Sequence, residues 1–185
     1  MLIADQVSPE RLRPLMRAEY ARLVDLGMFE DERIELLRGA LVTMSPPGAP
    51  HAHGTSWLAD CLPRSLGTRA LVRCQCPLAV SDDSQPQPDL AVVRRASYRD
   101  AHPTWAHLVV EVADSSLRKD RGVKRDLYAE AGIPEYWILN VQAQVVEVDR
   151  GPKDGTYTER HEVGIDGRLQ LLEFPDVELA VADLF

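Results

Sequence analysis

The chain has 185 residues, of which 45% are hydrophobic and 27% charged, and its formal net charge is -8. This length and composition are typical of one soluble globular domain with a sizeable core. The acidic balance argues against a general nucleic-acid-binding protein, because phosphate contacts need a basic surface. Residues 88–130 are the exception, since Arg and Lys slightly outnumber Asp and Glu there, so this segment can face a phosphate backbone.

Features that would indicate secretion, membrane insertion or a cysteine metal site are missing from the sequence. It holds no run of about 18 apolar residues, and Asp5 and Glu10 stand where a secretory signal would be basic and then apolar. The expected location is the cytoplasm, without membrane contact. The cysteines Cys61, Cys74 and Cys76 form no CxxC motif and are odd in number, which favours reduced structural thiols.

The first predicted helix covers residues 8–27. Ser8 and Pro9 are a capping residue and a proline at the first helical position. Apolar side chains then recur at helical spacing until Gly27. This amphipathic pattern predicts a helix packed on the outside of the domain.

A β-hairpin is predicted next, between residues 33 and 44. Two short apolar runs meet at Gly39, which is the expected turn. Glu35 lies in the first strand and faces away from its apolar neighbours. It is therefore either a solvated strand acid or a functional carboxylate, and the pattern alone favours neither.

A second helix is predicted from His51 to Leu66, with Gly67 as its end. His51 and His53 lie at its start. Because residues two apart on a helix point to different sides, the two histidines form a poor metal pair. The common interpretation is two polar residues of a first turn, and a catalytic or ligand role for His51 is the alternative.

Three strands are expected at residues 69–80, 89–93 and 106–112. The third is too apolar to have a solvent face, which is typical of a central strand covered on both sides. Asp89 and Glu111 each lie where a strand should bury apolar side chains. A buried carboxylate is costly unless it is paired, hydrogen-bonded or bound to a metal. Two of them on adjacent strands would form the hard oxygen site that Mg²⁺ prefers.

A helix from Arg121 to Ala131 is predicted to follow, capped by Asp120 and ended by Gly132. Lys124 borders its apolar stripe and can lie beside the sheet. Lysine is rare in this arginine-rich chain, so a compact ammonium is favoured at this position. Beside a metal it would stabilise the charge that develops during phosphodiester hydrolysis. The competing interpretation is a capping acid and a surface lysine.

The order of elements predicts an α/β (α+β) fold in a single domain of residues 1–185. Its mixed β-sheet core, at about residues 51–140, is flanked by helices and ends with a buried strand at 135–140. Additional β-structure is expected at both ends: the N-terminal helix and hairpin at 8–44, and an antiparallel ribbon at 141–185. The ribbon strands are predicted at 145–148, 156–163, 169–172 and 177–181.

Several motifs resemble those of one known family. They are Pro88-Asp89, Glu111-Val112-Ala113, Asp120-Arg121-Gly122-Val123-Lys124 and the run from Tyr128 to Ile138. Further similarities are Glu35-Leu36-Leu37-Arg38-Gly39, Met44-Ser45-Pro46, His51 and the closing Val181-Ala182-Asp183-Leu184-Phe185. With these motifs the sequence resembles the large bacterial Uma-type family of uncharacterised restriction endonucleases in the PD-(D/E)xK nuclease superfamily. The similarity extends over nearly the whole chain.

This resemblance implies a restriction-endonuclease-like core and a divalent metal, Mg²⁺ or Mn²⁺. The implied metal ligands are Asp89, Glu111 and the main-chain carbonyl of Ala113 or of the residue before it, with a contribution from Glu35. The superfamily motif places a lysine two residues after the acid, where this chain has Ala113. Lys124 is the natural substitute, as in branches whose lysine has moved to the following helix.

Two functions from different classes follow from these residues. The first is a Mg²⁺-dependent endonuclease that hydrolyses DNA phosphodiester bonds, acts as a homodimer, and uses Glu35, Asp89, Glu111 and Lys124 as catalytic residues. The ribbon edges at the C-terminus are the expected dimer contact. The alternative is a catalytically inactive binding or interaction module in which the same residues form a structural ion-pair cluster. The acidic balance and Ala113 favour the alternative, whereas the two carboxylates on buried strands favour the enzyme.

Overall fold

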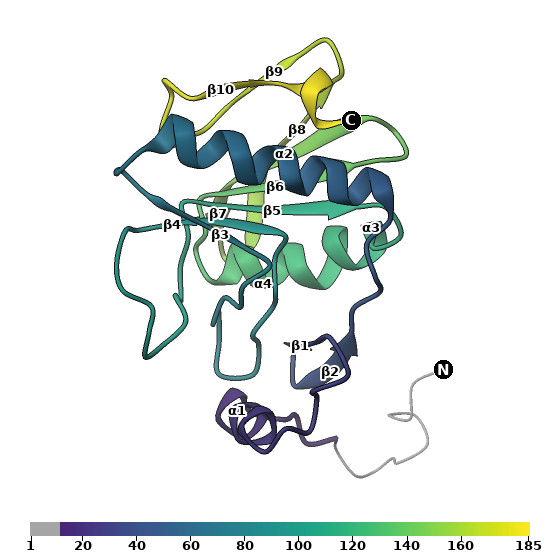
Figure 1. The fold of residues 1–185 in the computed structure, drawn as a ribbon, viewed down its shortest axis with the longest axis vertical. Coiled ribbons are helices and arrows are strands. Elements are labelled where there is room, and N and C mark those ends of the chain that lie inside the picture. The colour runs from purple at the N-terminus through teal and green to yellow at the C-terminus, as the bar shows by residue number, and fades with distance from the viewer. Residues whose placement is uncertain (1–11) are drawn as a thin grey trace.

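The computed structural model describes residues 12–185 and is built around one six-stranded mixed sheet (Figure 1). The strand order is β3-β4-β5-β6-β7-β8, and only β5 and β6 are parallel. The strands are β3 (Leu71–Cys74), β4 (Leu90–Val93), β5 (Leu108–Ala113), β6 (Glu135–Asn140), β7 (Val145–Lys153) and β8 (Thr156–Gly164).

The parallel pair β5 and β6 is joined by a helical crossover, as parallel strands require. The crossover contains α3 (Leu117–Lys119), a π-helical turn (Asp120–Lys124) and α4 (Arg125–Glu130). It covers one face of the sheet, and α2 (Ala49–Leu66) lies across the other (Figure 1). Every residue of β4, β5 and β6 is buried, because these strands have a helix on both sides.

Alternate residues of the central strands face the two helical layers. On the α2 side, Val110 and Val112 of β5 join a cluster with Leu58, Leu62 and Leu66. Burying each of these leucines stabilises the fold by about 2 kcal/mol. On the crossover side, the cluster includes Val109, Tyr128, Ile133, Tyr136 and Ile138. The sheet is thus the middle of three layers.

Smaller elements extend both ends of the chain, as the sequence predicts. The N-terminal elements are α1 (Arg17–Asp25) and a two-stranded sheet of β1 (Ile34–Leu37) and β2 (Ala40–Thr43). The C-terminal elements are a two-stranded sheet of β9 (Arg168–Gln170) and β10 (Glu178–Ala180), and a 3-10 turn (Val181–Leu184). The predicted fold class is confirmed: a mixed α/β sheet flanked by helices, with additional antiparallel strands at both ends.

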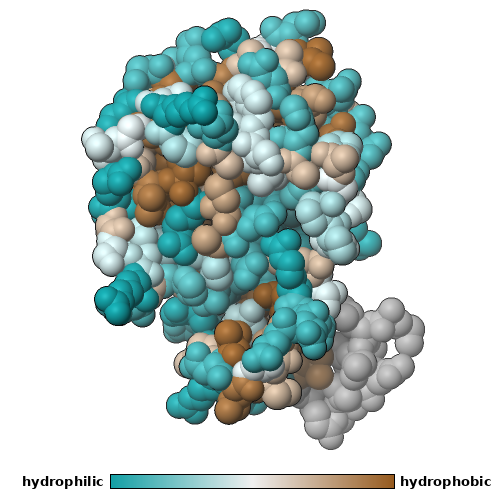
Figure 2. Space-filling model, viewed as in Figure 1, coloured by the Kyte–Doolittle hydropathy of each residue, from teal (hydrophilic) through white to brown (hydrophobic). Residues whose placement is uncertain are grey.

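The surface is polar over most of the face in Figure 2, with one apolar patch in its upper left part and another at the lower end around α1. The exposed apolar residues of this N-terminal region are Leu12, Met16, Val24, Leu26, Met28 and Leu41. Between residues 12 and 185, no helix has both the length and the apolar character needed to cross a membrane.

The first helix begins later than predicted. The expected start at Ser8 lies outside the described residues, but 12–16 are not helical. Their main chain is used elsewhere, since the Leu15 N–H donates to the Gly39 carbonyl at 3.1 Å. The helix starts at Arg17, where the Glu19 carboxylate accepts the Met16 N–H at 2.9 Å. A tertiary contact with the hairpin has replaced one helical turn.

Three other predicted boundaries are wrong. The strand expected at 69–80 ends at Cys74, because Gln75 adopts a positive φ of 48° and turns the chain. The helix expected from Arg121 begins at Leu117, so Asp120 lies inside a helical segment and is not its cap. The sheet also continues past residue 140, since β7 pairs with β6 and β8 with β7.

Candidate active site

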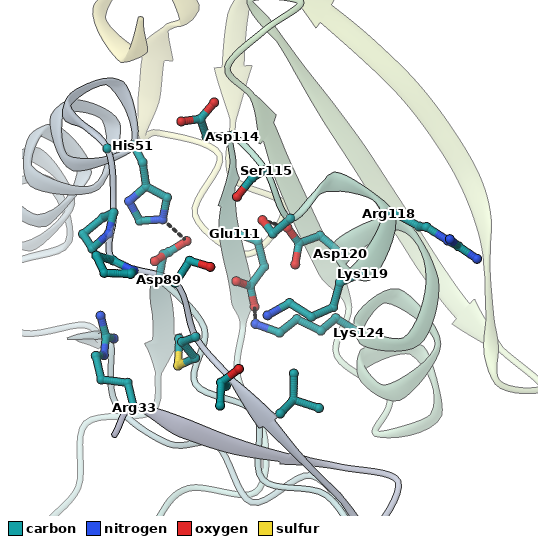
Figure 3. A pocket seen from close by; sticks show the side chains of 18 of the residues that line it. Arg33, His51, Asp89, Glu111, Asp114, Ser115, Arg118, Lys119, Asp120 and Lys124 are labelled. Carbon is teal, nitrogen blue, oxygen red and sulfur yellow. Dashed lines mark hydrogen bonds and ion pairs between the residues drawn. The ribbon is translucent and has the colours of Figure 1, made fainter. Parts of the chain in front are cut away.

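The predicted site residues meet at a cavity of about 890 Å³ (Figure 3). Its walls come from four parts of the chain: the β1–β2 hairpin with the loop after it, the start of α2, the residues next to β3 and β4 (Gln75 and Asp89), and the segment from β5 to the π turn. Asp89, Glu111 and Lys124 line the cavity. Glu35 is fully buried next to Lys124. The structure therefore brings all four predicted catalytic residues together.

Asp89 immediately precedes β4, and its carboxylate is held from two sides. Oδ2 accepts the Val112 main-chain N–H at 2.8 Å and lies 3.1 Å from Nε2 of His51. Oδ1 has only a marginal contact, with Nε2 of Gln75 at 3.5 Å. Burial alone would raise the pKa of Asp89, but His51 and the Val112 N–H lower it below its usual value. Asp89 is thus an ionised carboxylate with one oxygen largely free.

Glu111 lies in the middle of β5 and is 4% exposed. Its Oε1 accepts hydrogen bonds from Nζ of Lys124 at 2.9 Å and from the Tyr128 hydroxyl at 2.7 Å. Oε2 accepts no hydrogen bond from residues 12–185. Burial raises the pKa of Glu111 to about 8; the ammonium of Lys124 opposes this shift, and the charges of Asp120 and Asp89 add to it.

Lys124 is a buried ammonium, 1% exposed, and lies between two carboxylates. Nζ is 2.9 Å from Oε1 of Glu111 and 3.1 Å from Oε2 of Glu35. Burial alone would lower the pKa of Lys124, but the two carboxylates raise it above its ordinary value. The side chain therefore carries a positive charge at neutral pH, as a charge-stabilising residue requires.

Glu35 is not a solvated strand acid, because its exposure is 0%. Oε1 accepts from Nζ of Lys119 at 2.6 Å, and Oε2 accepts the Gln87 N–H at 3.2 Å while it contacts Lys124. Burial raises the pKa of Glu35, but the two lysines lower it more. Since both carboxylate oxygens are occupied, Glu35 is a partner for the lysines and is poorly suited to bind a metal directly.

The alternation of β5 explains how Lys124 reaches the position of the missing lysine. Glu111 and Ala113 are two residues apart, so their side chains point to the same face of the sheet. That face is covered by the helical crossover that carries Lys124. A lysine on this helix and a lysine at position 113 therefore approach the same carboxylate from the same side.

Three further residues touch the predicted ones, and a fourth lies at the same cavity. His51 contacts Asp89, Tyr128 donates to Glu111, Lys119 pairs with Glu35, and Asp120 lines the cavity with an almost fully buried side chain. Sequence patterns leave the role of His51 open, predict Asp120 as a helix cap, and indicate no role for Tyr128 or Lys119. The available signals were the rarity of lysine and the presence of Asp120 and Tyr128 in the family motifs.

The predicted main-chain ligand is already engaged in the sheet. The Ala113 carbonyl accepts the Val141 N–H at 3.1 Å, and Ala113 does not line the cavity. Within residues 12–185, no group of three or more His, Cys, Asp or Glu side chains has the spacing of a metal site. Mg²⁺ does not require such a group, because it is commonly bound through one or two carboxylates and keeps several waters.

The donor set around the cavity fits a divalent cation. Asp89 and Glu111 each have one oxygen held by the protein and one left largely or wholly free. Five carboxylates, including those of Asp114 and Glu35, meet two lysines and two arginines here, so the acids are in slight excess. The pKa values of Glu111 and Asp120 are raised first by burial and further by neighbouring carboxylates. A divalent cation would compensate this excess of negative charge.

A family model named Uma2 and described as "Putative restriction endonuclease" matches residues 17–182, a range that includes every residue of the site. The chain belongs to the Uma2 family. A solved structure with the same fold is that of "a putative nuclease belonging to DUF820" from Anabaena variabilis ATCC 29413. The TM-score is 0.74 at 16% sequence identity, over 93% of this chain and 98% of that chain. No match was found among curated proteins. At 16% identity, the similarity between the two structures establishes the fold of this Uma2 protein and nothing about its activity.

Proposed function

We propose that this Uma2 protein is a Mg²⁺-dependent endonuclease that hydrolyses DNA phosphodiester bonds. The observation that carries the proposal is the buried ammonium of Lys124, which lies between Glu111 and Glu35 at the wall of a cavity that Asp89 also lines. Burying a charge is costly, and a buried ion pair often contributes nothing net to stability. A reacting phosphate, in contrast, needs a fixed positive charge at such a place.

Asp89 and Glu111 would hold the cation through their free oxygens. When bound, Mg²⁺ or Mn²⁺ lowers the pKa of water and neutralises charge on the phosphate. The protein's part is to keep both carboxylates oriented. His51 and the Val112 N–H fix Asp89, while Tyr128 and Lys124 fix Glu111. These contacts leave one oxygen of each acid for the cation.

Lys124 is proposed to donate hydrogen bonds to the phosphate oxygens as negative charge builds up in the transition state. Glu35 is proposed to hold it in place, because its carboxylate pairs with both Lys124 and Lys119. The second lysine offsets part of the charge of Glu35, so Lys124 remains attracted to Glu111 and to an incoming phosphate. Glu35 thus acts through the lysine.

DNA is the proposed substrate because basic side chains lie at the edge of the cavity, although the cavity itself and the chain as a whole are acidic. Arg33 and Arg118 line it from opposite sides and are exposed (Figure 3). Phosphate contacts of this kind position a nucleic acid without reading its sequence.

A homodimer is proposed for cleavage of both strands, since one cavity faces one strand at a time.

Cleavage of supercoiled plasmid tests the proposal. The wild-type protein should cleave with Mg²⁺ or Mn²⁺ and not with EDTA, and Asp89→Ala and Lys124→Ala should each lower the rate about a hundredfold or more. Asp126→Asn is the matched control, because Asp126 is an exposed acid on α4 away from the cavity. Circular dichroism of each variant would show that the fold persists. A Lys124→Ala protein that is folded and cleaves at the wild-type rate would contradict the role of the lysine.

The second candidate is the inactive binding or interaction module. It is favoured by the extent to which Glu35, Glu111, Lys119 and Lys124 satisfy one another without a metal. This module predicts no cleavage with any divalent metal. It also predicts that Asp89→Ala lowers the melting temperature while added metal has no effect on either protein.

A further inference from the structure

Asp120 has a carboxylate oxygen that nothing in the described chain binds. The side chain is 1% exposed. Oδ2 accepts a hydrogen bond from Oγ of Ser116, and the main-chain carbonyl accepts one from the Tyr136 hydroxyl at 3.1 Å. Oδ1 is fully buried and has no partner among residues 12–185. Leaving a buried polar group unsatisfied costs about 1–3 kcal/mol. Within the described residues Oδ1 is unpaired, which indicates a partner from outside the chain.

Protonation does not remove the problem. Burial raises the pKa of Asp120 above its usual value, and the charge of Lys124 and the Ser116 hydrogen bond oppose this shift only in part. A charged Oδ1 would lack a donor, and a protonated Oδ1 would lack an acceptor. In both states the atom is suited to a ligand that the protein itself does not supply.

The helix is deformed so that Asp120 and Lys124 both reach the cavity. They are the first and last residues of the π-helical turn, both are buried, and both line the cavity wall. Gly122, between them, has non-helical backbone angles, and the helix kinks there. The same turn therefore presents one carboxylate and one ammonium to the cavity.

The free oxygens of the acids around the cavity form a pattern. Asp89, Glu111 and Asp120 each have one oxygen held by the protein and one that is free or nearly so. Glu35, in contrast, has both oxygens engaged. The three side chains are not spaced to bind one metal directly. If Asp120 contributes, it therefore does so across a water molecule.

We propose that Asp120 is a positioning residue for the cation, and that its free Oδ1 accepts a hydrogen bond from the hydration shell of a divalent metal held by Asp89 and Glu111. This inference rests on the metal site of the proposed function. Mg²⁺ gives up its waters reluctantly. Because Ser116 holds the Asp120 carboxylate in place, Oδ1 would accept a hydrogen bond from one of these waters and so orient the hydrated cation. Partners of this kind typically change metal affinity by about 10–100-fold.

Equilibrium binding of Mn²⁺ to the full chain, followed by electron paramagnetic resonance of the free ion, tests the role without an activity assay. Asp120→Asn keeps the shape of the side chain and should raise the Mn²⁺ dissociation constant about tenfold or more. The same variant should melt, without metal, at or above the wild-type temperature, because a buried carboxylate among other carboxylates has been neutralised. Asp126→Asn should match the wild type in both measurements.

Comparison of Asp89→Asn with Asp120→Asn distinguishes the role of Asp120 from the existence of the metal site. If Asp89→Asn abolishes Mn²⁺ binding while Asp120→Asn binds as the wild type does, Asp120 is not part of the cation site, although the site stands. If Asp120→Asn lowers the metal-free melting temperature and leaves affinity unchanged, its role is structural and the inference fails. A wild-type protein that binds no Mn²⁺ overturns both proposals.

A second variant keeps the inference testable if Asp120→Asn does not fold. Ser116→Ala removes only the hydroxyl that orients the Asp120 carboxylate. It should weaken Mn²⁺ binding several-fold, because the acceptor is retained but no longer fixed. Unchanged affinity in a folded Ser116→Ala protein would overturn the proposed orientation.

Discussion

At the scale of single residues, the site is a network in which each buried charge depends on the others. Lys124 has a carboxylate on two sides, and Glu35 has a lysine on two sides. Removal of one member of a buried pair leaves its partner charged and unpaired, which costs more than the pair contributes. Stability and the proposed catalysis therefore draw on the same side chains.

Lys124→Met should lower the free energy of unfolding by about 3 kcal/mol near neutral pH, because it leaves Glu111 and Glu35 without their shared ammonium. Urea unfolding measures this change. Lys153→Met is the control, since Lys153 is exposed and its loss should cost less than about 0.5 kcal/mol. Adding Glu35→Gln to Lys124→Met should recover part of the loss, because the two residues are in contact. Equal stability of the two lysine variants would contradict the network.

Glu147 makes a prediction about pH away from the cavity. Its side chain is fully buried and pairs with Arg121 and Arg160. Burial raises the pKa of Glu147, but the hydrogen bond and charge of Arg121 lower it below its usual value. A lowered folded-state pKa stabilises the fold above the unfolded-state pKa, near 4.3, and this contribution is lost as the pH falls through the folded-state pKa.

The wild type should therefore exceed Glu147→Gln in unfolding free energy by about 1–2 kcal/mol near pH 7. The difference should narrow as the pH is lowered below about 4. Parallel urea titrations at several pH values give the comparison. A difference that stays constant over this range would show that the carboxylate charge is not the source of the stabilisation.

At the scale of elements, the β1–β2 hairpin determines whether Glu35 reaches the lysines. Its two-residue turn, Arg38 and Gly39, has positive φ values of 53° and 73°, as hairpin turns of this type require. The turn also packs on the segment before α1, where a Cβ at position 39 would lie 2.3 Å from Cβ of Pro14 and 2.8 Å from the Leu15 nitrogen. Glycine is needed here for both conformation and space.

Gly39→Ala should therefore destabilise the protein by clearly more than about 1 kcal/mol, because it combines an unfavourable φ with a clash against backbone atoms. Gly132→Ala separates the two causes. Gly132 also has a positive φ, of 67°, but a Cβ there would meet no atom within 4 Å. Thermal unfolding of both variants should rank Gly39→Ala as the more damaging. An equal loss of stability in both variants would mean that Pro14 can move away from the added methyl group at little cost in free energy.

For the molecule as a whole, the two edges of the central sheet are the places where a second copy of the chain could pair. The edge strands are β3 and β8. The predicted apolar ribbon is polar at its edge, since the exposed residues of β8 include Glu159, Arg160 and Glu162. Charged edge residues disfavour strand pairing between copies. The proposed dimer therefore finds little support in that edge.

The homodimer remains a prediction with a direct measurement. Light scattering coupled to size-exclusion chromatography should give twice the chain mass of 20.7 kDa at micromolar concentration. Moderate salt should leave the dimer intact if apolar contacts hold it together, because screening weakens only charged contacts. A monomeric mass across the micromolar range would contradict the prediction.

Features that depend on local patterns can be predicted from the amino-acid sequence. Alternating and continuous apolarity located the central strands, Gly39 located the hairpin turn, and Asp89 and Glu111 stood out as carboxylates on buried strands. Such patterns predict elements because side-chain periodicity follows directly from backbone geometry.

Only the tertiary structure decided which charges meet. Glu35 and Lys119 are 84 residues apart in sequence, and their contact depends on where the hairpin packs against the crossover helix. The π turn that aims Asp120 and Lys124 at the cavity, and the late start of α1, likewise result from packing. These features cannot be derived from local propensity, because long-range contacts override it wherever a buried charge or main-chain group must find a partner.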